Sequence, residues 1–430
     1  MTKSNIKLAS YTFIFVLIVY IFEFYIFDTS YQHFSCVVVE NFKISNFENI
    51  RLPIHCDEGP YRFASQNIDH FFSETNPYQG RPLFVGTLAI FRKFFELFSF
   101  LNLSEYQNFK ISMLSVQFLV LFGIVKLFIS ITKLTLDSKL DFLIMFSLLC
   151  IPSLRWNLFL SSVGNITFLL FLLSLNYFEK AKYDEKKKNR LYILFGILSL
   201  AHLSSIVYAL IIEIIDIIRI KKIDYKGILT RFFLITIFQI LYRLAIQISK
   251  YSYFDWHKEV HNQFYWIISA LRNEGSLTNC QTFDTFWRCN FDVTISFIGY
   301  FLIIIFYFLS LFVLNKFINK QNPELMIYAL YINIFVFIFW SIQGIYEAFR
   351  FVNYSIGYFL FFSMILYIIS FKKNIILTFA MIAYSFSISY LEPYNTALYF
   401  PQLNLLTLFS ITLFLYFIYG ERKKKYQQIN

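Results

Sequence analysis

The sequence predicts an all-helical integral membrane protein. Hydrophobic residues make up 57% of the 430 residues and charged residues only 15%, and apolar stretches recur from one end of the chain to the other. In the interior of a bilayer, backbone groups are satisfied only in helices or in closed barrels. Continuous apolar runs such as 295–313 lack the alternation of barrel strands, so the spans are predicted to be helices. We expect about twelve of them in a single membrane domain, 1–430.

The expected spans follow one another along the chain. The first apolar stretch, 6–27, is too long for a signal peptide and no small-residue cleavage site follows it, so we expect it to remain as an anchor. A span needs roughly 20 predominantly apolar residues. The helices are expected at 8–27, 111–132, 140–153, 163–178, 191–203, 204–218, 230–248, 294–315, 325–342, 351–370, 375–390 and 403–419.

The distribution of Lys and Arg predicts the orientation. Cytoplasmic loops of membrane proteins carry an excess of these residues. With the amino terminus inside, the basic clusters 180–190, 219–231 and 422–425 all fall on the cytoplasmic side, and both termini are cytoplasmic. Two larger loops, 28–110 and 249–293, then lie outside. The net charge of +11 reflects this topology, and we expect no nucleic-acid partner.

Residues 83–100 test this topology because they are apolar enough to suggest a span. Arg92 and Glu96 interrupt the segment and share one helical stripe with Ser99, while phenylalanines supply much of the remainder. This pattern is typical of a helix that lies in the membrane interface. Pro82 is well placed as its first residue.

Residues 191–218 form the second decisive segment. They join two strongly basic loops and must therefore cross the membrane twice, with too few residues for two full spans. We expect two short helices that are broken around 202–205. A single long tilted helix is the alternative.

The cysteines lie largely in the predicted outer loops. Cys36 and Cys56 belong to the first loop and Cys280 and Cys289 to the second. Oxidising outer compartments favour disulfides, so Cys36–Cys56 and Cys280–Cys289 bridges are one interpretation. Free buried thiols are the other, since spacing alone does not establish geometry.

The pair Asp57-Glu58 in the first outer loop carries the strongest chemical signal. A carboxylate within hydrogen-bond reach of an acceptor group can take its proton, and Asp57 is our candidate base. Glu58 can orient the acceptor or, together with Asp57, ligate a divalent cation such as Mg²⁺ or Mn²⁺. The alternative is structural, because an acidic pair before Gly-Pro also suits a turn that begins a helix at Pro60.

In this region the chain resembles the GT-C superfamily of membrane glycosyltransferases. The resemblance rests on the acidic pair, on Tyr61 three residues after Glu58, on Arg81-Pro82-Leu83 before the interfacial helix, and on the many spans. It implies transfer of a sugar from a polyprenyl phosphate or diphosphate to a protein, lipid or glycan on the outer face. The late Arg350-Phe351 looks like the family's Arg-Tyr motif, with Phe in place of Tyr. Many members have a second acidic group where 155–165 here contains no Asp or Glu, which leaves fewer carboxylate ligands for a metal.

The remaining candidate residues would bind the donor and the acceptor. Arg350, with Arg81 second, is expected to bind the donor phosphate, because a fixed guanidinium stabilises the charge that develops on it. Either arginine can instead be an anchor at the membrane boundary. Candidate contacts to the sugar or the acceptor are His55, Tyr61, Trp256 and His257. For the aromatic residues of the second outer loop, the alternative role is an aromatic belt at the membrane interface.

These observations favour a glycosyltransferase of envelope-glycan or glycolipid assembly, with membrane lipids as its surroundings. A transporter or flippase of lipid-linked precursors is the alternative from another class, and a polymerase or ligase of lipid-linked oligosaccharides is a second enzyme class. Transporters tend to carry charges at mid-membrane and to show related halves, whereas these spans hold few charges and no repeat. The abundance of Phe, Ile, Lys and Asn points to a bacterial inner membrane, although an endoplasmic reticulum would present the same topology.

Overall fold

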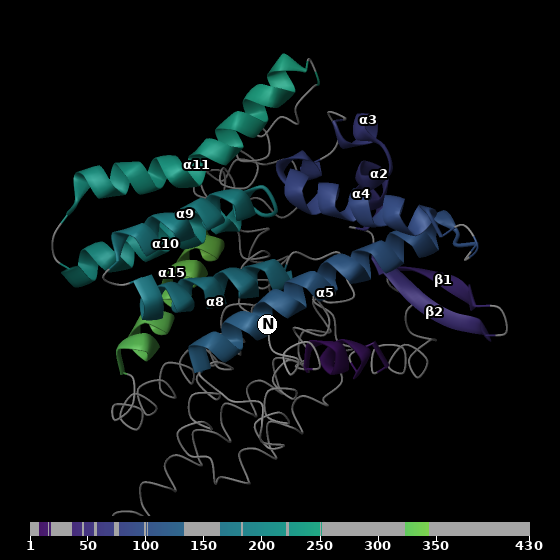
Figure 1. Ribbon diagram of the computed structural model, residues 1–430, viewed down its shortest axis with the longest axis horizontal. Coiled ribbons are helices and arrows are strands. Elements are labelled where there is room, and N and C mark those ends of the chain that lie inside the picture. The colour runs from purple at the N-terminus through teal and green to yellow at the C-terminus, as the bar shows by residue number, and fades with distance from the viewer. Residues whose placement is uncertain are drawn as a thin grey trace, which may run out of the picture. The chain divides into compact units, whose positions relative to one another are not determined.

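The computed structural model divides the chain into two compact units, Met1–Asp255 and Trp256–Asn430 (Figure 1). Expected spans at 140–153, 294–315, 351–370, 375–390 and 403–419 lie outside the part of the chain that the structure describes. The four cysteines of the predicted outer loops also lie outside it, as does the predicted second outer loop apart from Ser249 and Tyr251. The described residues are 8–15, 17–18, 37–44, 47–55, 58–72, 77–98, 100, 102–132, 164–181, 184–220, 223–249, 251 and 323–343.

The described part of the chain is mostly helical, as its composition predicts. Residues 8–15, inside the expected first span, are also helical. The second unit contributes α15 (Pro323–Gln343). The helices of the first unit are α2 (Glu58–Gln66), α3 (Ile68–Phe71), the 3-10 helix η2 (Pro77–Gly80), α4 (Pro82–Glu96), α5 (Glu105–Thr132), α8 (Gly164–Ala181), α9 (Glu185–Ser199), α10 (Ser204–Ile220) and α11 (Tyr225–Ile248).

The expectation of an all-helical chain is wrong in the segment predicted as the first outer loop. Strands β1 (Val37–Ile44) and β2 (Phe47–His55) form an antiparallel hairpin in which Val37 lies opposite His55 (Figure 1). β-branched residues are frequent in both segments and favour a pleated backbone. The hairpin ends three residues before α2, close in sequence to the acidic pair.

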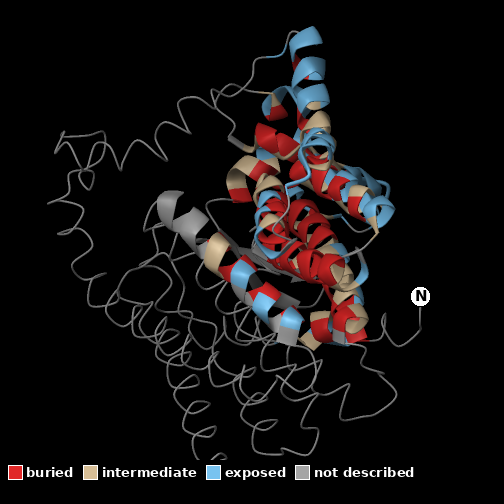
Figure 2. Cartoon of the chain, turned by 90° about the vertical axis from the view of Figure 1, so that its left-hand side faces the viewer, coloured by how far each residue is buried: buried red, intermediate tan, exposed pale blue. Residues whose placement is uncertain are grey.

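Among the described residues, two helices, α5 and α11, are long and apolar enough to cross a membrane. At 1.5 Å per residue, the 24 residues of α11 extend about 36 Å. Only 17% of the apolar window of α11 is buried, whereas the core helix of a soluble protein is mostly buried. Figure 2 shows how buried residues gather where the helices pack and exposed ones mark the outer surfaces. Large apolar side chains exposed on α11 are Leu229, Phe232, Phe233, Ile240, Leu241, Leu244 and Ile248.

Helix α8 is the central helix of the first unit. It packs against α5 on one side and against α9 and α10 on another, and α9 in turn packs along α11. Its buried residues cover most of its circumference, as expected of a helix with neighbours all round. They are Asn165, Ile166, Thr167, Phe168, Leu170, Phe171, Leu172, Leu173, Ser174, Leu175, Tyr177 and Phe178.

The predicted break in 191–218 is confirmed, because α9 ends at Ser199 and α10 begins at Ser204. The two helices are about 22 and 26 Å long, each shorter than the roughly 30 Å of hydrocarbon in a bilayer. Carbonyls left open at the break find partners from other elements. The Ser199 carbonyl accepts from Gln239 Nε2 of α11 at 2.8 Å, and the Leu200 carbonyl accepts from the Leu83 amide of α4 at 2.9 Å. Elements α4 and α11 thus complete the turn.

Helix α4 begins at Pro82, as the sequence predicts. Of its predicted polar stripe, Arg92 faces the protein: it is 3% exposed and donates to the Arg62 carbonyl at 2.7 Å and to Ser65 Oγ at 3.0 Å, whereas Glu96 is exposed. Arg92 also pairs with Glu105 of α5. Burial lowers the pKa of Arg92, and Glu105 opposes that shift. The opposite face is apolar and exposed, and it includes Leu83, Ile90, Phe94 and Leu97.

Gly196 brings α9 and α11 into close approach. A Cβ atom at this position would lie 2.6 Å from the Leu234 carbonyl oxygen and 2.8 Å from Phe238 Cδ2. We therefore expect Gly196→Ala to lower the free energy of unfolding by about 1–3 kcal/mol, because the two backbones must separate. Denaturant unfolding of the purified protein measures this change. Gly86→Ala is the matched control, because its Cβ would meet nothing within 4 Å; equal behaviour of the two variants would contradict the close approach.

Candidate functional site

Half of the candidate site residues lie in the described part of the chain. Glu58, Tyr61 and Arg81 are described with their side chains, and His55 through its backbone at the end of β2. The other candidates, for which the structure gives no placement, are Asp57, Arg350, Trp256 and His257.

Glu58 begins α2 and is completely buried. Both of its carboxylate oxygens accept from Lys110 Nζ of α5, at 2.8 and 3.1 Å. Lys110 is itself 1% exposed, so the pair compensates two charges that are both removed from solvent. This lysine was missed in the sequence because it directly precedes the predicted span 111–132 and reads as the end of a loop.

The pairing with Lys110 bears on the possible metal site. The oxygens of Glu58 that would ligate Mg²⁺ or Mn²⁺ are hydrogen-bonded to an ammonium group. Among the described residues, no cluster of three or more His, Cys, Asp or Glu side chains could hold a metal ion. A metal bound by Asp57 and Glu58 stays a prediction, and binding there would have to displace Lys110 from at least one oxygen.

Arg81 precedes α4 and contacts two aromatic side chains, Tyr61 and Tyr78. Its Nη1 donates to the Tyr61 hydroxyl, and its guanidinium lies 4.9 Å from the centre of the Tyr78 ring. The rings of Tyr61 and Tyr78 stack with centroids 4.0 Å apart. Cation–π contacts and a defined hydrogen bond together fix the direction of a side chain that is otherwise flexible. The burial of Tyr61, which is 1% exposed, makes it a support for Arg81.

The turn between α9 and α10 lies beside Arg81. Leu83, two residues after Arg81, donates its amide hydrogen to the Leu200 carbonyl of this turn at 2.9 Å. From α11, the Tyr242 hydroxyl donates to the Gln79 carbonyl at 2.7 Å. The sequence marked 202–205 as a break but not as a neighbour of Arg81, because the contact joins segments far apart in the chain.

The acidic and basic candidates of the first loop meet on one side of α2. Glu58 and Tyr61 are three residues apart, so they share a helical face. Tyr61 holds Arg81, while Glu58 is the residue that follows Asp57. The arrangement places a fixed guanidinium on the side of α2 that carries Glu58 and Tyr61. A fixed guanidinium can bind an anionic group.

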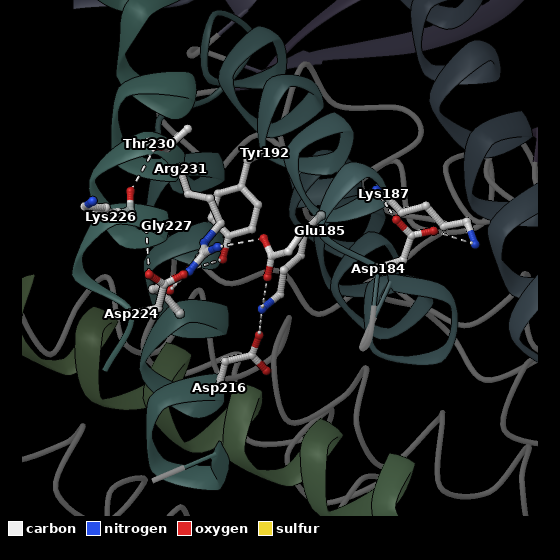
Figure 3. Close-up of polar contacts among 12 residues, drawn as sticks. Asp184, Glu185, Lys187, Tyr192, Asp216, Asp224, Lys226, Gly227, Thr230 and Arg231 are labelled. Carbon is white, nitrogen blue, oxygen red and sulfur yellow. Dashed lines mark hydrogen bonds and ion pairs between the residues drawn. The ribbon is translucent and has the colours of Figure 1, made fainter. Parts of the chain in front are cut away.

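A second polar cluster lies at the opposite end of the helices (Figure 3). Arg231 of α11 donates to both carboxylate oxygens of Glu213, at 2.8 and 2.7 Å, and to Glu185 at 3.1 Å. Lys188 pairs with Asp216 at 3.0 Å. The sequence showed Glu213 and Asp216 only as charges near a helix end, since their partners come from other helices.

Two tyrosines complete this cluster. Tyr192 donates to Glu213 at 2.7 Å, and Tyr177 donates to Asp216 at 2.6 Å. Each buried carboxylate therefore has a cation and a hydroxyl as partners. These partners offset the free-energy cost of removing the charges from water. The signal in the sequence was the i,i+3 spacing of the two acids on α10 and the i,i+4 spacing of Lys188 and Tyr192 on α9. We interpret the cluster as a clasp that joins α8, α9, α10 and α11.

Capping aspartates begin two of the clasped helices. Asp184 accepts from the Lys187 amide at 3.1 Å before α9, and Asp224 accepts from the Gly227 amide at 3.1 Å before α11 (Figure 3). The bond from the Lys187 amide lowers the pKa of Asp184. These caps satisfy amides at the helix starts and so set where each helix begins.

No family model, curated protein or solved structure matches the chain. The functional argument therefore rests on the residues of the site. Its two main components are the fixed guanidinium of Arg81 and the buried Glu58–Lys110 pair, both organised by α2.

Proposed function

We propose that the chain is a multi-pass membrane glycosyltransferase of the GT-C type. It transfers a sugar from a polyprenyl phosphate or diphosphate to a glycan, lipid or protein acceptor on the outer face, in envelope-glycan or glycolipid assembly. The observation that carries the proposal is the fixing of Arg81 by Tyr61 and Tyr78 beside the helix that begins with Glu58. The membrane is proposed to be a bacterial inner membrane, with both termini in the cytoplasm.

The positions of the charged groups support this orientation. Helices α9 and α11 both begin in the clasp, at Glu185 and near Arg231, and run toward the elements that surround Arg81. The basic clusters that would face the cytoplasm thus lie at one end of these helices and Arg81 at the other. This separation is what the positive-inside rule requires if Arg81 works outside.

The proposed reaction uses one base and one cation. Asp57 takes the proton of the acceptor hydroxyl or amide as the acceptor atom bonds to the anomeric carbon of the sugar. The bond from that carbon to the phosphate oxygen breaks, and the phosphate leaves with the electron pair. Arg81 stabilises the charge gained by the phosphate, with Arg350 as a further candidate. Glu58, bound to Lys110, holds the start of α2 next to Asp57.

The test is a turnover assay with the purified full-length protein. Release of free polyprenyl phosphate is measured with a panel of polyprenyl-linked sugars and a mixed acceptor extract. We expect turnover by the wild type and a loss of about 100-fold in Asp57→Asn, because the base is removed without a change of size. Asp69→Asn, at an exposed position of the same loop, is the matched control and should keep full turnover. Turnover that is indifferent to Asp57 would refute the mechanism.

A flippase of lipid-linked precursors is the second candidate. The clasp favours it, because ionisable residues buried among membrane helices often mark transport pathways. In sealed vesicles, a flippase would move a labelled carrier across the bilayer without releasing polyprenyl phosphate. A polymerase or ligase would also release the polyprenyl carrier, as the proposed glycosyltransferase does. It would differ from the glycosyltransferase by requiring a lipid-linked or completed oligosaccharide as its acceptor.

A further inference from the structure

Two largely buried arginines, Arg62 of α2 and Arg92 of α4, share one carboxylate. The Oε1 atom of Glu105, at the start of α5, lies 3.4 Å from Arg92 Nη2 and 3.9 Å from Arg62 Nε. Hydrogen bonds from a charged N–H group to a carboxylate are usually about 2.7–2.9 Å long. Elsewhere in this chain, Arg231 reaches the two carboxylate oxygens of Glu213 at 2.7 and 2.8 Å. Glu105 therefore approaches both arginines without fully pairing either.

Both guanidinium groups keep a buried donor without a partner. The Nε atoms of Arg62 and Arg92 are buried, and neither has a hydrogen-bond partner among the described residues. Arg92 is 3% exposed and uses only its Nη atoms, toward the Arg62 carbonyl, Ser65 and the shared carboxylate. The Arg62 guanidinium lies 3.9 Å from the centre of the Tyr106 ring and 4.7 Å from that of Phe63. These rings hold the cation in place but supply no oxygen acceptor.

The arginine pair carries more positive than negative charge. Two guanidinium groups meet a single carboxylate, and Glu105 is 44% exposed. The neighbouring charged pairs compensate themselves, namely Lys93 with Glu96 and Lys110 with Glu58. A cation that is removed from water and incompletely paired is unfavourable, so a further anion would stabilise this place. Because Glu105 is exposed, its side chain can turn into solvent and leave the arginines to a ligand with two oxygens.

The position of Arg62 on α2 relates this place to the proposed site. Arg62 follows Glu58 by four residues, so the two lie one turn apart on one face, with Cβ atoms about 5–6 Å apart. Asp57, the proposed base, directly precedes Glu58 in the sequence. Tyr61, the residue before Arg62, holds Arg81, the proposed ligand of the donor phosphate. Helix α2 thus organises two cationic places, of which only that of Arg81 has a proposed ligand.

We propose that Arg62 and Arg92 bind an oxyanion of the acceptor, a carboxylate or phosphate group, in place of the Glu105 side chain. This inference rests on the proposed function and names the class of its acceptor, which carries a negative charge. Planar guanidinium groups present N–H donors in fixed directions, which suits a group with two or three equivalent oxygens. Binding at Arg62 orients the acceptor relative to the base, and Glu105 competes with the acceptor for the same donors.

The first test is anion binding by the full-length protein in nanodiscs of phosphatidylcholine, measured by titration calorimetry at constant ionic strength. The probes are inorganic phosphate and glucuronate, with glucose as the uncharged reference. Glu105→Gln is expected to bind both anions about tenfold more tightly than the wild type, because the competing carboxylate is removed. Arg62→Gln is expected to bind them about tenfold more weakly. Lys93→Gln, which removes an exposed cation of α4, is the matched control and should bind as the wild type does.

The direction of the Glu105→Gln effect separates a ligand site from a structural ion pair. If the carboxylate served only to hold the two arginines, its removal would not raise the affinity for any anion. Equal affinities of the wild type, Glu105→Gln and Arg62→Gln would show an adventitious ion only and overturn the inference. Glu105 is partly exposed, so this variant carries the test even if Arg62→Gln does not fold. Loss of phosphate binding in nanodiscs of phosphatidylglycerol would identify a lipid headgroup as the ligand and overturn the assignment to the acceptor.

The second test connects the anion site to turnover. The mixed acceptor extract is separated by anion exchange, and release of polyprenyl phosphate is measured with the retained and the unretained fractions. We expect turnover with the retained, anionic fraction, and Arg62→Gln should raise KM for it about tenfold with little change in kcat. Turnover with the unretained fraction alone would overturn the inference and keep the proposed glycosyltransferase. Anion binding of the expected direction without turnover of any donor would reject the glycosyltransferase, and with it the assignment of the anion to an acceptor.

Discussion

Replacement of Arg81 by alanine is expected to reduce the rate of sugar transfer by about 10²- to 10³-fold, which is the usual cost of losing a fixed donor to developing charge. The phosphate gains negative charge as the sugar leaves, and Arg81 is held toward one direction by Tyr61 and Tyr78 before any substrate arrives. Arg81→Lys should recover only part of the rate, because an ammonium group does not reproduce the planar fork of a guanidinium. The measurement is the release of polyprenyl phosphate at saturating donor.

The control for Arg81 removes an arginine elsewhere. Arg190→Ala changes the net charge equally at an exposed position of α9, near the opposite end of the helix, and should leave the rate unchanged. Tyr61→Phe removes only the hydroxyl that fixes Arg81, and a loss of about tenfold is expected from the weaker alignment. A rate in Arg81→Ala within a few-fold of the wild type would assign Arg81 to membrane anchoring.

Replacement of Arg231 by methionine is expected to lower the free energy of unfolding by about 3–5 kcal/mol. Arg231 donates two hydrogen bonds to Glu213, and both side chains are largely buried. Without Arg231, the carboxylate of Glu213 would keep Tyr192 but lose the cation that compensates its charge. The measurement is unfolding of the purified protein in denaturant, followed by helical signal.

A double variant distinguishes the lost ion pair from lost packing. Glu213→Gln with Arg231→Met removes both charges, so most of the stability should return. Arg219→Met is the control, because Arg219 is exposed at the end of α10, and its effect should stay below about 1 kcal/mol. A double variant no more stable than Arg231→Met would show that the clasp acts through packing and not through charge.

The helices that the sequence predicted share local signals. Pro82 marks the start of α4, and the apolar runs before and after 202–205 are too short for full spans and flanked by basic residues, so the break could be read directly. The hairpin of β1 and β2 was missed because its strands lie in a stretch that reads as a polar loop. Strands in such a stretch give a weak pattern compared with the long apolar runs around them.

The candidate site was predictable in its members but not in its contacts. Glu58 and Arg81 were chosen from the sequence, yet Lys110, the partner of Glu58, lies 52 residues away. Contacts between such distant positions depend on how helices pack, which residue spacing does not encode. The one available signal was a lysine that directly precedes the apolar run 111–132.

The two hydrogen bonds that close the turn at Ser199 and Leu200 join it to segments that the ribosome makes at different times. The partner of Leu200 is Leu83, which the ribosome makes earlier, whereas the partner of Ser199 is Gln239, which it makes later. An open carbonyl is costly in hydrocarbon, so in the proposed membrane topology we expect the nascent pair α9 and α10 to keep its turn near water until α11 emerges. Full insertion of the pair would then follow the synthesis of α11.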